Sequence, residues 1–198
     1  MRYLNKVRQI LSGKGFPVFS IRDIRIILSS QGAGARYAYT LLHNMAARKE
    51  ITRITRGIYT FHSDVRVVGF AFAPFYYGLE DALSIKGMWE QGANPVIITH
   101  RKTRIGTRAF LQRNYVIHRI DLKHFFGFEL VKYGDLWIPV SDAEKTIIDF
   151  VYFNHYLRPD ILKKLKRDAD AGKIKRYLKA YDRRFSNKVI GLLGMDGN

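Results

Sequence analysis

The stretch from Ser20 to Phe61 restricts the fold more than any other part of the chain. Ser20 and Asp23 have the spacing of a helix capping box, and the IRDIRIILSS segment that follows repeats its apolar residues at helical spacing. Residues 31–34 include two glycines, which tolerate the positive φ values that a sharp reversal needs. A second helix is expected over residues 35–49. The stretch therefore predicts two helices joined by a tight turn.

The second of these helices has two chemically distinct faces. Its apolar face has the spacing i, i+3, i+4, i+7 and comprises Ala38, Leu41, Leu42 and Met45. Its other face begins near the helix N-terminus and comprises Arg36, Tyr37, Tyr39, Thr40, His43 and Asn44. Helices that read DNA place such side chains in the major groove, where Arg contacts guanine and Asn contacts adenine. We therefore expect this face to bind DNA.

The next segment, ITRITRGIYTF, predicts a β-hairpin. Its apolar residues are expected to face inward: Ile51, Ile54, Ile58 and Phe61. Residues 55–57 form the expected tip, where cations commonly contact the DNA backbone or minor groove, so Arg53 and Arg56 join the candidate DNA-binding residues. An amphipathic helix over residues 2–12 and an extended piece over 16–19 precede these elements. Together they predict a winged helix-turn-helix domain over residues 1–62; the alternative is a small helical domain with ordinary polar faces.

The charge of the chain favours a polyanionic partner. There are 34 Lys and Arg residues against 17 Asp and Glu, a net charge of +17. Residues 1–61 hold 11 cations and 2 acids, whereas residues 62–157 hold 11 and 10. Such an excess attracts nucleic acid and makes the binding salt-dependent. An anionic membrane is a weaker alternative, because neither end combines a strong apolar face with Trp anchors.

Composition sets the compartment and class that we expect. Hydrophobic residues make up 47% of the 198 residues, which indicates a folded protein. No apolar run approaches the roughly 20 residues that cross a bilayer, and MRYLNKVRQIL lacks the apolar core of a secretory signal. The absence of cysteine excludes disulfides and thiolate metal sites. These features predict a cytoplasmic protein without a membrane partner.

Residues 63–198 predict a mixed α/β domain, so the whole chain is expected to be α+β. Strands are expected where β-branched and aromatic residues gather, at residues 65–72, 96–99, 115–122, 125–133 and 137–140. The cationic segment HRKTRIGTRAF predicts a hairpin loop or a strand edge. A helix is expected over residues 79–89, and Pro159 occupies the first position of another.

The chain ends in two expected basic helices, ILKKLKRDA and KIKRYLKAYDRRF. Residues 158–188 hold 12 cations and 4 acids, a net charge of +8. Their cations form a second candidate nucleic-acid surface that comprises Lys163, Lys164, Lys166, Arg167, Lys173, Lys175, Arg176, Arg183 and Arg184. The alternative is the solvated face of two helices. The last segment, IGLLGMDGN, is expected to dock Ile190, Leu192 and Leu193 and then to fray.

An enzymatic interpretation has thin support. Asp142, Glu144, Lys145 and Asp149 suggest a metal-dependent nuclease, but such sites usually carry Glu-x-Lys on a strand, and here Glu144 and Lys145 are adjacent. Residues 141–144 match an S-x-x-E capping box for a helix that continues TIIDFVYF. The six histidines form no i, i+4 pair, and no nucleotide-binding loop or nucleophile elbow is present. We expect no catalytic residues, metal or cofactor.

Three segments resemble the AbiEi-type antitoxin and transcriptional regulator family. LLHNMAARKEITRITRGIYTF is similar to its helix-plus-wing segment, YYGLEDALSIKGMWEQ to its Tyr…Ala-Leu…Gly helix, and VSDAEKTIIDFV to its Glu-Lys-Thr…Asp helix. They occur in the family's order and span about residues 41–151. The chain departs from the family at Lys49-Glu50, where a glycine is frequent, and at Asp81, where serine is frequent.

The resemblance implies a winged helix that binds operator DNA, at inverted repeats, and a C-terminal α/β domain over residues 63–198. It further implies an autorepressing antitoxin of a type IV toxin–antitoxin pair, which counters a nucleotidyltransferase-like toxin without a stable complex. An alternative from the residues themselves is RNA binding, through aromatic side chains that stand among cations: Tyr76, Tyr77, Phe110 and Tyr115.

Overall fold

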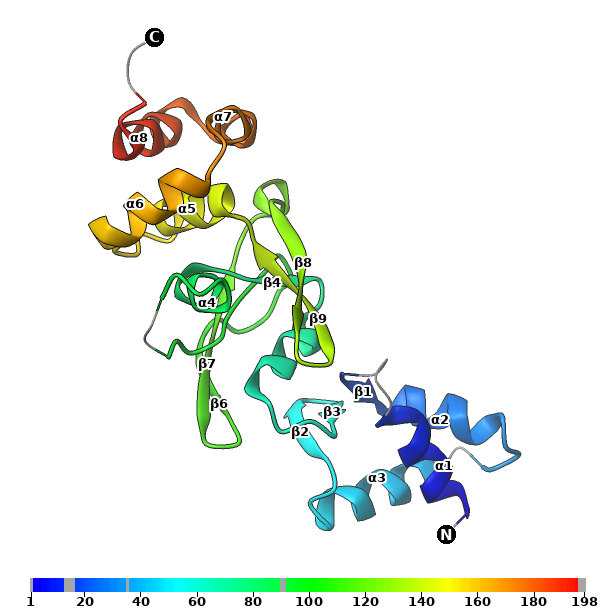
Figure 1. Cartoon of the computed structure of the whole chain (residues 1–198). Helices are drawn as coiled ribbons and strands as arrows, with labels where there is room; N and C mark the ends of the chain where they lie inside the picture. Colours follow the sequence, from blue (N-terminus) through cyan, green and yellow to red (C-terminus); the bar gives the residue numbers. More distant parts are fainter. Residues whose placement is uncertain (1, 13–16, 35, 90–91, 196–198) are drawn as a thin grey trace. The chain divides into compact units, whose positions relative to one another are not determined.

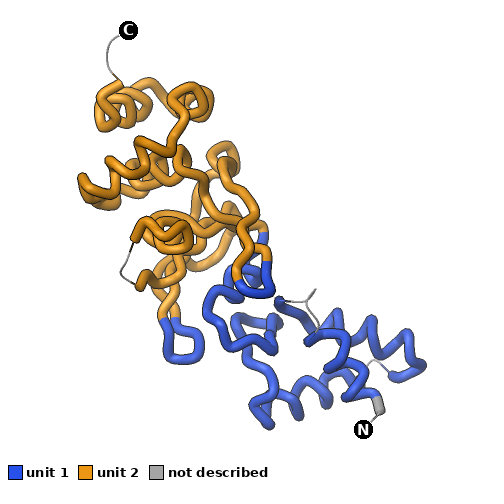
Figure 2. Tube along the Cα trace, viewed as in Figure 1, with its two compact units in different colours: residues 1–73, 109–113, 134–136 blue, residues 74–108, 114–133, 137–198 orange. Residues whose placement is uncertain are grey.

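The computed structural model of the chain describes residues 2–12, 17–34, 36–89 and 92–195. The architecture is α+β, as expected, and it divides into two compact units (Figure 2). Unit 1 comprises residues 1–73, 109–113 and 134–136; unit 2 comprises residues 74–108, 114–133 and 137–198. Phe16, Ala35 and the last three residues, where an extended start, a helix start and fraying were expected, lie outside the described residues.

The described residues of unit 1 include three α-helices that pack around one apolar core. They are α1 (Arg2–Leu11), α2 (Ile21–Ser29) and α3 (Tyr37–Ala47). The expected capping box begins α2: the Ser20 hydroxyl accepts from the backbone N–H of Asp23, and the Asp23 carboxylate accepts from the Ser20 N–H at 2.7 Å. The expected turn follows, with Gly32 at a φ of 73°. The core comprises Val7, Leu11, Phe19, Ile24, Leu28, Ala38, Leu41, Met45 and Ile51.

A small antiparallel sheet completes this arrangement. Its strands β1 (Phe19–Ser20), β2 (Thr52–Thr55) and β3 (Ile58–Thr60) have the order β1-β3-β2. The β2–β3 hairpin confirms the expected ribbon and its tip. Of the four residues expected to face inward, Ile51 is buried, and Ile54, Ile58 and Phe61 are half-buried. Because β1 pairs with β3, the hairpin is joined to the segment that caps α2.

The strand expected over residues 65–72 is wrong. These residues form the 3₁₀ helix η1 (Val65–Phe72), in which the Asp64 carboxylate accepts from the Arg66 N–H at 2.7 Å. The segment is buried on several sides, so its apolar run is nearly continuous. A short continuous run of this kind does not distinguish a strand from a helix.

Unit 2 is built on a mixed six-stranded sheet with the order β6-β7-β5-β4-β9-β8 (Figure 1). The strands are β4 (Phe75–Tyr77), β5 (Val96–Thr99), β6 (Gly106–Phe110), β7 (Arg113–Arg119), β8 (Phe128–Tyr133) and β9 (Leu136–Ser141). β4 pairs antiparallel with β5 and parallel with β9. The expected β8–β9 pair is confirmed. The short strand β4 was not expected, and the short 3₁₀ helix η2 (Leu122–His124) follows β7 where that strand was expected to continue.

Five α-helices belong to unit 2: α4 (Leu79–Ile85), α5 (Ala143–Tyr152), α6 (Pro159–Asp168), α7 (Ala171–Leu178) and α8 (Arg183–Leu193). α5 contacts each of the other four, and Ile147, Ile148 and Phe150 are buried in its core. Pro159 begins α6 as expected, but three helices follow α5 rather than two. The second expected basic helix is broken because Asp182 caps a new helix, accepting from the Phe185 N–H at 2.8 Å.

The last helix docks only in part as expected. Leu193 is buried and Ile190 packs against the core, whereas Leu192 is exposed. The helix expected over residues 79–89 ends earlier, at Ile85. In the described part of the chain, no helix has the length and apolar character to cross a membrane.

Lys49 is a strained residue at the junction between α3 and the hairpin. Its φ is 57°, and the chain closes the helix there with a hydrogen bond from the Glu50 N–H to the Met45 carbonyl at 3.0 Å. Glu50 is held in turn by an ion pair with Arg8 of α1 at 2.5 Å. This is a helix C-terminus of the kind that usually carries glycine.

We expect Lys49→Gly to raise the free energy of unfolding by about 1 kcal/mol, because a left-handed backbone has a steric cost for residues with a Cβ. Urea unfolding at neutral pH measures the change. Lys49→Ala removes the same charge but keeps the Cβ, so it should not stabilise the protein. An equal gain in both variants would assign the effect to charge.

Candidate functional site

The polar face of α3 is open to solvent because the opposite face is buried. Ala38, Leu41 and Met45 lie in the core of unit 1. All six expected residues on the other face are exposed: Arg36, Tyr37, Tyr39, Thr40, His43 and Asn44. The burial of one face therefore fixes which side chains of α3 are available to a ligand.

Four of these side chains are free to bind. In the described residues, the side chains of Arg36, Thr40, His43 and Asn44 form no hydrogen bond or ion pair with the protein. Their spacing, i, i+4, i+7 and i+8, places them along one stripe of the helix. Tyr37 flanks the stripe and contacts the edge of Tyr3 of α1, with ring centroids 6.0 Å apart.

Tyr39 is already engaged by a residue that the sequence analysis missed. Arg25 of α2 donates from Nη2 to the Tyr39 hydroxyl at 2.8 Å, and its guanidinium carbon lies 4.9 Å from the ring centroid. The Nε atom of Arg25 is buried and has no hydrogen-bond partner among the described residues. No local pattern predicts this contact, because Arg25 stands between Ile24 and Ile26 and its partner is 14 residues away.

The two hairpin cations are both exposed but differ in their contacts. Arg53 donates from Nε to the carbonyl of Thr55 at 3.2 Å, so its side chain lies along its own strand. Arg56 lies at the tip, next to Gly57, and forms no ion pair with another described residue. Arg56 is therefore the cation of the hairpin that is better placed to contact a ligand.

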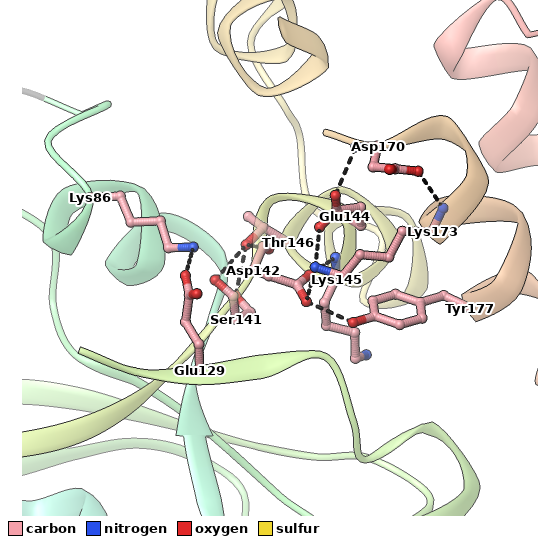
Figure 3. A network of polar contacts seen from close by, with 10 residues as sticks. All are labelled: Lys86, Glu129, Ser141, Asp142, Glu144, Lys145, Thr146, Asp170, Lys173 and Tyr177. Carbon is pink, nitrogen blue, oxygen red and sulfur yellow. Dashed lines mark hydrogen bonds and ion pairs between the residues drawn. The ribbon is translucent and has the colours of Figure 1, made fainter. Parts of the chain in front are cut away.

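The second set of expected cations is distributed over α6, α7 and α8. Seven of them are exposed: Lys163, Lys166, Arg167, Lys175, Arg176, Arg183 and Arg184. Lys164 and Lys173 are half-buried. Lys173 is bound internally, with Nζ 3.1 Å from the carboxylate of Asp142 and 3.0 Å from that of Glu144 (Figure 3). It does not belong to a free cationic surface.

The capping box expected at residues 141–144 is wrong. The first helical turn of α5 is capped by Asp142, whose Oδ1 accepts from the Lys145 N–H at 2.7 Å. Ser141 is still part of β9, and its hydroxyl bonds that of Thr146 at 2.7 Å. Glu144 instead reaches the N-cap of α7, where its carboxylate accepts from the Asp170 N–H at 2.8 Å. The sheet holds one residue more than expected, so the cap moves by one position.

A buried ion pair lies behind this turn. Lys145 and Asp149 are one helical turn apart on α5, are fully buried and form an ion pair. The Tyr76 hydroxyl donates to Asp149 at 2.9 Å, and Lys145 Nζ donates to the Tyr181 hydroxyl at 3.3 Å. Burial raises the pKa of Asp149, and the opposing effects of Lys145 and Tyr76 do not cancel it. The residues considered for a nuclease thus serve as contacts between secondary-structure elements.

A second group of polar contacts joins α7 to the start of α5. The Tyr177 hydroxyl donates to Asp142 at 2.8 Å, and burial together with this carboxylate raises the pKa of Tyr177 to about 12. Burial alone would raise the pKa of Glu144, but its hydrogen bonds with the Asp170 N–H and Lys173 hold that pKa below the ordinary value. These contacts therefore favour the ionised form of Glu144.

Gly127 lies in close contact with Lys145 of α5 and Tyr177 of α7. Its φ is 75°, and a Cβ atom there would lie 2.8 Å from Lys145 Cβ and 2.9 Å from the ring of Tyr177. Only glycine fits between the two side chains without displacing them.

The aromatic residues proposed for RNA binding are not on the surface. Tyr76, Tyr77, Phe110 and Tyr115 are all buried, at 5% exposure or less. Because a stacking platform must be accessible to bases, these four side chains do not form one.

No protein-family model matches the chain, and no curated protein matches it. Among solved structures, it is similar to the crystal structure of the Rv2827c protein from Mycobacterium tuberculosis, with a TM-score of 0.64 and 14% sequence identity. The similarity covers 98% of this chain and 78% of that one. It establishes that the two chains share a fold.

We expect Asp149→Ala to lower the free energy of unfolding by about 3–5 kcal/mol, because it leaves the buried Lys145 ammonium unpaired. Urea unfolding measures the loss. The double variant Lys145→Met/Asp149→Leu removes both charges and should recover most of the stability. A loss below about 1 kcal/mol in the single variant would contradict the buried pair.

The lowered pKa of Glu144 predicts a pH-dependent contribution to stability. A carboxyl group whose pKa is lower in the folded state stabilises the protein above its unfolded pKa of about 4.3, and this contribution is lost as the pH falls through the folded value. We expect Glu144→Gln to be less stable than the unmodified protein at pH 7 and the difference to shrink below about pH 4. Unfolding midpoints across this range test it; a constant difference would exclude the linkage.

Proposed function

We propose that this chain is a sequence-specific DNA-binding regulator of transcription that acts through α3 and the β2–β3 hairpin. The observation that carries the proposal is the exposed, unpartnered stripe of α3 opposite a buried face. The order of elements in unit 1 is helix, short strand, two helices and a hairpin paired with that strand. This order supports a winged helix-turn-helix in which α3 is the recognition helix.

In this proposal the stripe of α3 reads base edges in the major groove. Arg36 and Asn44 stand eight positions apart, which corresponds to a rise of about 12 Å along a helix. That length spans about three or four base pairs of B-DNA. Arg36 would bind guanine O6 and N7, Asn44 adenine N6 and N7, and Thr40 and His43 the bases between them.

The cations beside the stripe position the protein on the backbone. Arg56 at the hairpin tip and Arg53 contact phosphates or the minor groove. Arg25 joins them, since Tyr39 holds its guanidinium beside α3 at 2.8 Å. These contacts supply affinity and orientation, whereas the stripe supplies sequence preference.

The regulator is, in this proposal, the autorepressing antitoxin of a type IV toxin–antitoxin pair. Its operator contains inverted repeats, and its toxin is nucleotidyltransferase-like and forms no stable complex with it. The resemblance to AbiEi-type proteins carries this part. The left-handed Lys49 supports it, because this residue adopts at the start of the wing the conformation that glycine favours where the family often has one. Co-expression with a toxin encoded by a neighbouring gene tests it. Cells that produce the toxin should survive only if they also produce this protein.

We expect Arg36→Ala and Asn44→Ala each to cost about 1–3 kcal/mol of binding free energy on a selected duplex and to relax one base position. Arg56→Ala should weaken all sequences alike, because phosphates carry no sequence information. Selection from a random duplex library, followed by fluorescence anisotropy on selected and scrambled duplexes, measures both effects.

A matched control removes an arginine from the other end of α3. Arg48 is exposed at the C-cap of the helix, one turn beyond Asn44. Because recognition helices contact bases near their N-termini, Arg48→Ala should leave the selected sequence unchanged. Equal losses on selected and scrambled duplexes for Arg36→Ala, Asn44→Ala and Arg56→Ala would overturn the assignment of α3. Stronger competition by structured RNA than by duplex DNA would favour the alternative of RNA binding.

A further inference from the structure

The three C-terminal helices each carry a cationic stripe opposite a buried one. The buried stripes consist of Ile161 and Leu165 on α6, Ile174 and Leu178 on α7, and Val189 and Leu193 on α8. The exposed cations are Lys163, Lys166 and Arg167 on α6, Lys175 and Arg176 on α7 with Lys179 at its C-cap, and Arg183, Arg184 and Lys188 on α8. Each set contains at least one pair three or four positions apart, and such pairs are neighbours on the helix surface.

Three of the four acids in residues 158–188 make local contacts, whereas Asp168 is exposed at the end of α6. Asp160 binds the guanidinium of Arg158 at 2.8 and 3.0 Å. Asp170 caps α7, and its Oδ1 accepts from the Lys173 N–H at 2.7 Å; Asp182 caps α8 in the same way. These three acids serve helix starts and one exposed arginine, so the nine cations of the three stripes far outnumber the acid that remains, Asp168.

The first turn of α8 carries two cations directly after its acidic cap, Asp182. Arg183 and Arg184 occupy its first two positions, and the helix contains no acidic residue. The N-terminal end of a helix carries a partial positive charge, so it is stabilised by anions and destabilised by cations. A bound polyanion would convert this repulsion into attraction.

The aromatic side chains Tyr177, Tyr181 and Phe185 are half-buried and contact other residues of the protein. Tyr181 stacks on His124 with ring centroids 4.0 Å apart, and Phe185 stacks on Tyr181 at 4.6 Å. Tyr177 is bound to Asp142. Proteins that bind single strands combine cations with exposed aromatic rings, whereas binding to a duplex backbone needs only the cations.

We infer that α6, α7 and α8 form a second surface that binds the phosphate backbone of double-stranded DNA without regard to sequence. It comprises the nine stripe cations and excludes Lys173 and Arg158, which are paired within the protein. It adds to the proposed function an electrostatic contact made by unit 2, and it does not depend on what α3 reads.

The test uses the full chain and a duplex of about 30 base pairs of mixed sequence, without any selected operator. Fluorescence anisotropy across a series of KCl concentrations gives the slope of log Kd against log salt. Each phosphate contact contributes about 0.9 to this slope. We expect the variant Lys175→Gln/Arg176→Gln/Arg183→Gln/Arg184→Gln to have a slope of log Kd against log salt that is smaller by about 2–4. It should also bind the duplex at least tenfold more weakly near 0.1 M salt.

A second variant removes the same charge from another part of unit 2: Lys102→Gln/Arg104→Gln/Arg119→Gln/Lys132→Gln. All four side chains are exposed, so both variants should fold, which thermal unfolding checks. Equal slopes in the two variants would show a diffuse effect of net charge and overturn the surface. Weaker binding of an RNA hairpin with an unchanged duplex slope would also overturn it. If the α3 substitutions did not change which duplexes are selected, the proposed function would be rejected. The salt dependence measured for the α6–α8 surface would still stand.

Discussion

The ion pair between Lys145 and Asp149 is the interaction on which unit 2 depends. It is fully buried, and its hydrogen bonds come from Tyr76 on β4 and Tyr181 just before α8. A buried pair of charges is tolerated only where its remaining hydrogen-bonding groups are satisfied. The strand, α5 and the chain that leads into α8 must therefore meet in one arrangement. Gly127 allows its own segment to lie directly against Lys145 of α5 and Tyr177 of α7.

This arrangement changes the meaning of the most recognisable motif in the sequence. The EKTIID segment suggested a nuclease site or part of a capping box. Its Glu144 accepts from the N-cap of α7, and its Lys145 and Asp149 form the buried pair that Tyr76 and Tyr181 complete. The exposed cationic and polar side chains described above lie elsewhere, on α3 and the hairpin of unit 1 and on the last three helices.

The sequence predicted those parts of the fold that local signals determine. The capping box at Ser20, the two faces of α3 and the hairpin tip each depend on residues within a few positions of one another. The errors arose where distant partners decide the outcome. Ser141 is retained by its strand, so Asp142 becomes the cap; Lys173 is paired by acids on α5; and Arg25 is held by a tyrosine on another helix. Residues 65–72 are buried as predicted, but they form a 3₁₀ helix instead of a strand.

The left-handed backbone of Lys49 affects more than the end of one helix. This residue stands between α3 and β2, and the next residue is anchored to α1 by Arg8. A residue with a Cβ has only a narrow left-handed energy well, whereas glycine has a wide one. The junction is therefore stiff: the hairpin cannot swing relative to α3 without leaving that well, and the spacing between the α3 stripe and the hairpin cations is set before any ligand binds.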